Sequence, residues 1–360
     1  MANRTKQAYF NFCGEFIASK NRPLMNDAKI ETRRGPMNAR SMSFGVKDEK
    51  NVCYVDAFDF VRDKILTYNQ AGEKVEVNWD DRLDEDVIKS VASYRKYTVN
   101  ITERKEFITV YDMIGYLAET LPTYEGDIVV TGQFSMQADK KGTIRTKFNI
   151  GNVYAAQPEQ DKRHFSMTAD LYYNRDSIDK TDLKESKKVY VNAYLPVYVN
   201  SDEGTKFFPF SGVFNTAVYN LENEKHKALY EYRMKYIDTK SKNYQHMLWE
   251  MRVVNGAEEV PFDESMLTPA QKEQITLGIH DIDFFKPRKG VLGNSVKEFR
   301  LFDPKLTGEY SDGMLDCDFT NKEFEEMIFV PSHEERLADV VASAETKAAD
   351  KSGVDDEDMF

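Results

Sequence analysis

The sequence predicts a β-rich α+β protein in which two β-barrel-like units follow one another, with added helices and an acidic C-terminal tail. The first observation is a series of short segments with alternating apolar and polar residues, separated by polar turns. The second is a glycine inside two of these segments, Gly14 and Gly132, because a glycine within a strand often marks a bulge or sharp bend. The third is residues 333–360, which carry nine acidic and three basic residues.

Length and composition set broad limits. The 360 residues suffice for two to three domains, and 41% hydrophobic with 31% charged residues describes a globular protein. No stretch approaches about 18 consecutive apolar residues, so no membrane span is expected. Cys13, Cys53 and Cys317 are isolated, which favours a reducing, cytoplasmic compartment. No phosphate loop, nucleophile elbow or dinucleotide fingerprint is present, so no cofactor is expected.

The first unit is predicted over residues 1–122. Its expected strands share period-2 alternation and lie at 8–19, 40–46, 52–60, 64–69 and 107–111. Residues 20–39, after the first strand, form a basic, turn-rich insertion, and the turn at 47–51 joins a hairpin. Helices are expected at 84–93 and at 112–121, where Pro122 ends the second.

The second unit is predicted over residues 123–219. Its expected strands have the same alternation and lie at 127–137, 143–154, 164–173, 188–199 and 207–216. A weak internal echo supports a boundary before it, because Gly14-Glu15-Phe16 and Gly132-Gln133-Phe134 each precede a strand of the form Arg…Phe.

The remaining chain is predicted as a helical and mixed extension over 220–330 and a disordered acidic tail over 331–360. In the extension, the pattern indicates a helix at 220–238 and a strand at 243–254. A further helix should begin at Thr268, with Pro269 in its first position. The tail is rich in Ala, Glu, Asp and Lys and lacks the apolar surface that folding requires.

Aromatic and cationic side chains share strand faces in a way that suits single-stranded nucleic acid. Bases stack on aromatic rings, and cations follow the phosphates. In the second unit these residues are Arg145, Lys147, Tyr190 and Tyr194. In the first unit the candidates are Arg33, Arg34 and Arg40, on or beside a hairpin-like loop, with Phe44 and Tyr54 nearby in the sequence, where some aromatic residues are also expected in the core. Tyrosines, arginines and lysines are also ordinary on solvent-facing strands, so this pattern alone leaves both interpretations open.

The two ends of the chain carry opposite charge. Residues 1–40 have eight basic and three acidic residues, whereas the whole chain has a net charge of -12. Such asymmetry hints at nucleic-acid or self-competing binding. The terminal residues Asp355, Asp356, Glu357, Asp358, Met359 and Phe360 suit docking by a partner, because a basic rim attracts the acids and an apolar pocket takes the phenyl ring.

These features resemble a known family. A bent, Gly-containing first strand, a following hairpin and a late helix resemble the OB-fold. An acid run ending in Phe, here Asp355–Asp358 and Phe360, resembles the tail of phage-type single-stranded DNA-binding proteins; Met359 stands where bacterial members have proline. The resemblance implies tandem OB-like barrels and a tail that recruits a polymerase, helicase or nuclease.

The function predicted on this basis is non-enzymatic, sequence-tolerant coating of single-stranded DNA during phage replication, recombination or repair. One alternative is a β-rich virion or assembly protein with a solubilising tail. Another is a metal-dependent nuclease using the acids Asp281, Asp283, Asp316 and Asp318. The scattered histidines give no ligand spacing that favours the nuclease, and no metal is expected.

Overall fold

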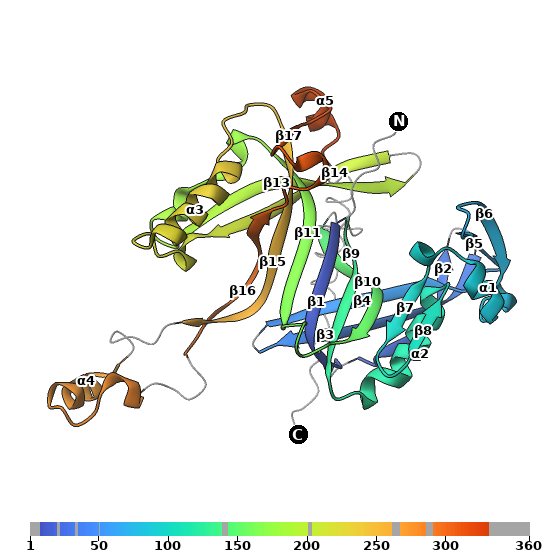
Figure 1. Ribbon diagram of the computed structural model, residues 1–360, viewed down its shortest axis with the longest axis horizontal. Coiled ribbons are helices and arrows are strands. Elements are labelled where there is room, and N and C mark those ends of the chain that lie inside the picture. The colour runs from blue at the N-terminus through green and yellow to red at the C-terminus, as the bar shows by residue number, and fades with distance from the viewer. Residues whose placement is uncertain are drawn as a thin grey trace, which may run out of the picture.

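The computed structural model describes residues 8–19, 22–32, 35–49, 51–138, 143–200, 204–260, 267–285 and 291–330. Within them, strands dominate, with one fifteen-stranded sheet and one two-stranded sheet. Figure 1 shows two strand-rich bodies side by side, with β1, β9 and β11 between them. A small insertion with β5 and β6 lies at one end, and an arm carrying α4 extends at the other.

The first body contains a closed circuit of strand pairing, here called the first ring. Its members in spatial order are β1 (Ala8–Ile17), β3 (Gly35–Asp48), β4 (Asn51–Phe60), β10 (Ile144–Ala155) and β9 (Asp127–Ala138), and β9 pairs back with β1. All of these pairs are antiparallel except β4 with β10, which meet in parallel at Asp56 and Asn149. Between β4 and β9 in the chain comes α2 (Val110–Thr120), which packs on β3 and β4.

The second body repeats this circuit, and we call it the second ring. Its members are β11 (His164–Tyr173), β13 (Lys188–Asn200), β14 (Gly204–Asn215), β16 (Val291–Pro304) and β15 (Gln245–Val260), and β15 pairs back with β11. Here β14 and β16 are the parallel pair, and α3 (Glu224–Ile237) lies between β14 and β15 in the chain. Antiparallel pairing of β1 with β11 joins the two rings.

Gly14 allows β1 to serve both bodies. On one edge, β1 pairs with β11 over residues 9–13 and then with β3 over residues 15–17. A Cβ atom at Gly14 would collide with the carbonyl oxygen of Lys47 on β3. Only glycine tolerates this close approach of two backbones, and Gly14 lies where this edge of β1 changes its partner from β11 to β3.

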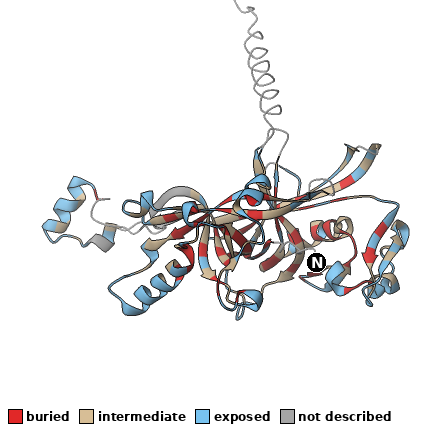
Figure 2. Cartoon of the chain, turned by 90° about the horizontal axis from the view of Figure 1, so that it is seen from above, coloured by how far each residue is buried: buried red, intermediate tan, exposed pale blue. Residues whose placement is uncertain are grey.

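The core runs without a break from one ring to the other. Figure 2 shows buried residues concentrated in the central strands. Phe10 and Phe12 of β1 point into this core, and Phe134 of β9 lies 5.5 Å from Phe299 of β16 between ring centroids. Each such buried side chain contributes roughly 1.5–3 kcal/mol to folding, so the two rings are held in a fixed relation.

Further strands and helices extend the two rings. After β4, an insertion with β5 (Lys64–Tyr68), β6 (Lys74–Asn78) and α1 (Glu85–Ser90) has its own small core. The other strands are β2 (Met25–Thr32), β7 (Tyr97–Asn100), β8 (Arg104–Phe107), β12 (Ile178–Asp179) and β17 (Leu315–Asp316). Short 3-10 turns lie at Trp79–Asp81, Ser93–Arg95, Leu121–Thr123, Arg175–Ser177, Thr181–Leu183, Thr216–Val218, Ile282–Phe285 and Gly308–Tyr310.

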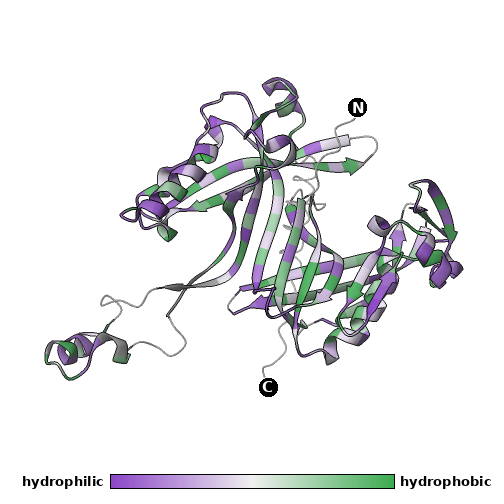
Figure 3. Cartoon of the chain, in the orientation of Figure 1, coloured by the Kyte–Doolittle hydropathy of each residue, from purple (hydrophilic) through white to green (hydrophobic). Residues whose placement is uncertain are grey.

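Beyond the second ring, β15 and β16 lead into the arm. The helix α4 (Pro269–Thr276) lies at its far end, where Figure 3 shows hydrophilic and hydrophobic residues mixed. As predicted, Thr268 caps this helix and Pro269 begins it. Helix α5 (Asn321–Glu326) packs on the second ring. No helix in the described part of the chain is long and apolar enough to cross a membrane.

The ring circuits cross the predicted domain boundaries. The boundary between residues 122 and 123 separates β9 and β10 from β1, β3 and β4, yet all five strands form one ring. Likewise, β15 and β16 belong to the second ring and not to a separate extension over 220–330. The first circuit spans 8–155 and the second spans 164–304.

Both copies of the internal echo lie in the first ring. Phe10 of β1 pairs directly with Gly132 of β9, so the two glycine-containing strands are neighbours in one ring and do not begin two units. Two smaller corrections concern the first unit. The turn-rich insertion at 20–39 contains β2 and the start of β3, and the strand expected at 107–111 ends at Phe107, before α2.

Candidate nucleic-acid interface

An open groove, here called the first groove, lies on the outer face of the first ring. Its volume is about 770 Å³. The floor is formed by β3, β4 and β10, and the segment between β1 and β2 forms one rim. The lining residues are Ser19, Arg22, Pro23, Leu24, Asn26, Ser41, Met42, Ser43, Tyr54, Asp56, Ala57, Phe58 and Lys147.

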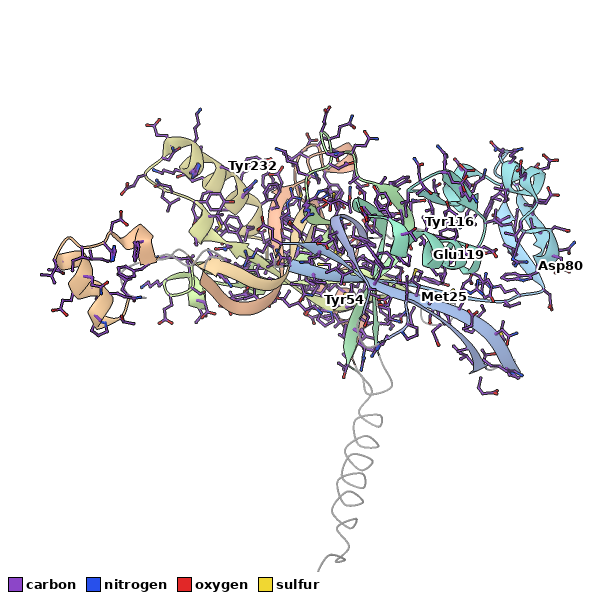
Figure 4. The ribbon with its side chains drawn as sticks, turned by 90° about the horizontal axis from the view of Figure 1, so that it is seen from below. Met25, Tyr54, Asp80, Tyr116, Glu119 and Tyr232 are labelled. Atoms are coloured by element: carbon purple, nitrogen blue, oxygen red, sulfur yellow. The ribbon has the colours of Figure 1, made fainter. Side chains whose placement is uncertain are left out.

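Two aromatic rings stand on the floor of this groove. Along β4, Val55 and Ala57 point into the core, so alternation turns Tyr54 and Phe58 outward. They are 52% and 47% exposed. Figure 4 views the molecule from below and labels Tyr54 near the middle of the view. Two large rings left open in one groove provide flat apolar surfaces for a ligand.

Cations flank the aromatic rings. Lys147 is exposed on the outer face of β10, and the parallel pairing of Asn149 with Asp56 places that strand beside β4. Arg22 is exposed at the rim. The Asp56 carboxylate also lines the groove, so the local charge is mixed and only weakly positive. Ser41 and Ser43 also line the groove, and their small side chains leave space beside the two aromatic rings.

A second groove, of about 710 Å³, lies where the two rings meet. Arg145 from β10, Tyr190 from β13 and Lys297 from β16 converge on it. Its other lining residues are Met136, Ile144, Thr146, Pro209, Phe210, Ser211, Val213, Glu298 and Phe299. The Glu298 carboxylate is neutralised within the protein, since Lys188 lies 2.5 Å and Arg300 2.8 Å from its oxygens.

Arg145 and Tyr190 thus line the same groove, and the two strands carry the alternation of faces seen in the sequence. Arg145 and Lys147 are exposed, whereas Phe148 and Ile150 of the same strand are buried.

Phe44 and Arg40, predicted as nucleic-acid contacts, instead make contacts with other residues of the protein. Phe44 is fully buried in the first ring, with its ring 5.5 Å from that of Phe16, so its assignment to the surface is corrected. Arg40 donates two hydrogen bonds to the Asp27 carboxylate, of 2.7 and 3.0 Å, and its guanidinium lies 4.0 Å above the Tyr111 ring. This hydrogen bond lowers the pKa of Asp27 and raises the pKa of Arg40.

Tyr194 lies against helix α5 and lines neither groove. Its ring makes edge contacts with Tyr244 at 5.9 Å and with Phe324 of α5 at 5.6 Å. Phe324 is fully buried and also lies 4.1 Å from Phe207. The outer face of β13 is thus divided, because Tyr190 lines the second groove while Tyr194 is covered.

Other predicted residues lie outside the described part of the chain. These are Arg33, Arg34 and the tail residues Asp355, Asp356, Glu357, Asp358, Met359 and Phe360. The residues selected from the sequence as nucleic-acid contacts do not include Arg22, Phe58 and Lys297, which line the grooves. Phe58 could have been found from the alternation with Tyr54, but Arg22 and Lys297 reach the grooves through long-range pairing.

The acids of the nuclease alternative are dispersed. The Asp281 carboxylate accepts a hydrogen bond of 2.9 Å from the backbone of Phe284 beside the arm helix α4, whereas Asp316 accepts one of 2.9 Å from Gln245 on the second ring. In the described residues, no group of three or more His, Cys, Asp or Glu side chains is placed to hold a metal ion.

Comparison with known proteins gives little beyond this geometry. No family model matches the chain, and no curated protein matches it. Among solved structures, the chain is similar to the crystal structure of wild-type single-stranded DNA binding protein from Thermus aquaticus, with a TM-score of 0.30 and 11% identity. The match covers 70% of this chain and 86% of that chain. Similarity at this level carries no weight for fold or function.

Proposed function

We propose that this protein binds single-stranded DNA without strong sequence preference and coats it, with no catalytic activity, during phage DNA replication or recombination. The observation that carries the proposal is the pair Tyr54 and Phe58, exposed on β4 in a groove flanked by Lys147 and Arg22. Every base has a flat π-face, so stacking on such rings is tolerant of sequence.

The order of strands in each ring supports an OB-type barrel. In an OB-fold, a five-stranded Greek-key barrel binds oligonucleotides on the face of its second and third strands and on the loops beside them. In the first ring these strands are β3 and β4, which form the floor of the first groove, and Arg22 lies in the loop before them. The parallel β4–β10 pair and the position of α2 fit the same assignment.

The charge of the molecule favours single strands over duplex. A net charge of -12 disfavours a broad electrostatic footprint on double-stranded DNA. Stacking on Tyr54 and Phe58 is available only to unpaired bases. Binding should therefore depend on base contacts and on a few cations.

The deciding experiment is an anisotropy titration with labelled oligo-dT and with duplex DNA at two salt concentrations. We expect a micromolar or tighter Kd for the single strand, much weaker duplex binding, and a log–log salt slope of roughly -1.5 to -2 for two to three phosphate contacts. Equal affinity for both, or none for either, would refute the proposal. Stable oligomers without affinity for single strands would instead support a virion or assembly protein.

The proposal extends to the terminal residues 355–360, whose role rests on the sequence. We expect that deleting residues 351–360 leaves the affinity for oligo-dT equal or tighter at low salt, because negative charge is removed. The same deletion should abolish pull-down of a polymerase, helicase or nuclease. Phe360→Ala serves as the matched variant, since it keeps every acidic residue and should lose the partner alone. Weaker DNA binding after the deletion would contradict this role.

A further inference from the structure

The outer face of β10 touches both grooves. Lys147 lines the first groove and Arg145 lines the second. The two residues are separated by one position, so they lie on the same face of the strand, roughly 6.6–6.8 Å apart along it. No strand of the fold intervenes between them. Lys147 of the first groove and Arg145 of the second are therefore neighbours on one face of β10.

The two rings are also fixed to one another beside this strand. The Asn255 side chain on β15 donates a hydrogen bond of 2.6 Å to the carbonyl of Val52 on β4, and Gly256 pairs with Asn51. With the packing of Phe134 on Phe299, these contacts hold the grooves in one register. A ligand that leaves the first groove past Lys147 meets Arg145 at a defined place.

We propose that the two grooves form one continuous path, so that a single chain binds one DNA strand across both rings. This inference rests on the proposed single-stranded DNA binding. The halves of the path are unequal: the first groove offers Tyr54 and Phe58, whereas the second offers Tyr190, because Phe324 covers Tyr194. A short oligonucleotide occupies the first groove, and a longer one crosses Lys147 and Arg145 to reach Tyr190.

Joining the grooves makes affinity depend on strand length. Once a strand is held in the first groove, its continuation meets the second groove at a high effective concentration. Oligo-dT of about 20 nucleotides should therefore bind roughly tenfold or more tightly than oligo-dT of about 6 nucleotides, a length within the site size of one OB-fold. Both should bind with one strand per chain.

The test compares these two lengths on the full chain by anisotropy, with stoichiometry from saturation at high protein concentration. In Tyr190→Ala and in Arg145→Ala, the logarithm of the ratio between the two affinities should fall to about half of its value in the unmodified protein, or less. Tyr198→Ala is the matched control, because Tyr198 is on the same strand, is 62% exposed and lines neither groove. It should leave the ratio unchanged.

Hydrogen exchange on the unmodified protein gives a readout that no folding defect can mimic. The short oligonucleotide should protect β4 and its surroundings, and only the long one should also protect β13 and β14. Two short oligonucleotides bound per protein chain would overturn the continuous path and leave single-stranded DNA binding intact. The same holds if both variants keep the ratio between the affinities for the long and the short oligonucleotide. Absence of binding at either length would instead refute the proposed function itself.

Discussion

Replacing Tyr54 and Phe58 together with alanine is expected to lower the affinity for oligo-dT by at least about 30-fold. Stacking of one base on an aromatic side chain is worth about 1–3 kcal/mol, so the loss of two platforms should amount to about 2–6 kcal/mol. Both rings are about half exposed, and their removal opens no cavity in the core. The fold should therefore remain, and the salt slope should change little because no cation is lost.

The control for this pair is Tyr94→Ala. Tyr94 is 68% exposed in the insertion between β4 and α2 and lines neither groove. It should bind oligo-dT like the unmodified chain. If the double variant also binds as tightly as the unmodified chain, with an unchanged melting curve, the first groove is not the DNA site.

Local alternation of apolar and polar residues was enough to predict which face of an individual β-strand is buried. The inward row Val189, Val191, Ala193 and Leu195 is buried as predicted, and Arg145 and Lys147 point outward. Such period-2 patterns reflect whether one side of a strand meets the core, which the sequence records residue by residue.

What covers an outward face depends on residues far away in the chain. Arg40 lies on an outward row, yet Asp27 and Tyr111 occupy its guanidinium. Tyr194 also points outward, yet Phe324, from a helix that was not predicted from the sequence, packs against it. No local sequence pattern predicts these contacts. A predicted outward face therefore identified only candidate residues for contact with nucleic acid.

Strand pairing across the predicted domain boundaries has a related cause. Strand order in a β protein is set by pairing between distant segments, and β1 meets β9 across more than one hundred residues of chain. Gly14 and Gly132 gave both strands the same local appearance, although a Cβ at either would collide with the backbone of a different neighbouring strand. Similar local signals therefore marked two members of one ring.

Phe44→Ala is expected to lower the stability of the protein by about 3–5 kcal/mol, the usual result of deleting a buried phenyl ring. Phe44 is fully buried, and its ring packs edge-on against Phe16. The effect should appear as a lower urea midpoint for the transition that unfolds the first ring, since the deleted ring leaves a cavity between its strands. Tyr54→Ala, one residue from the Phe44 partner Val55, should change the free energy of unfolding by no more than about 0.5 kcal/mol.

When affinity for DNA is measured instead of stability, Tyr54→Ala should have the larger effect and Phe44→Ala the smaller. Below the denaturation midpoint, folded Phe44→Ala should retain most of its affinity for oligo-dT, whereas Tyr54→Ala should lose about 1–3 kcal/mol of it. A Phe44→Ala protein that unfolds like the unmodified chain but fails to bind oligo-dT would place the Phe44 ring on the surface, as the sequence suggested. The reciprocal pattern ties stability to the inward row of the first ring and binding to its outward row.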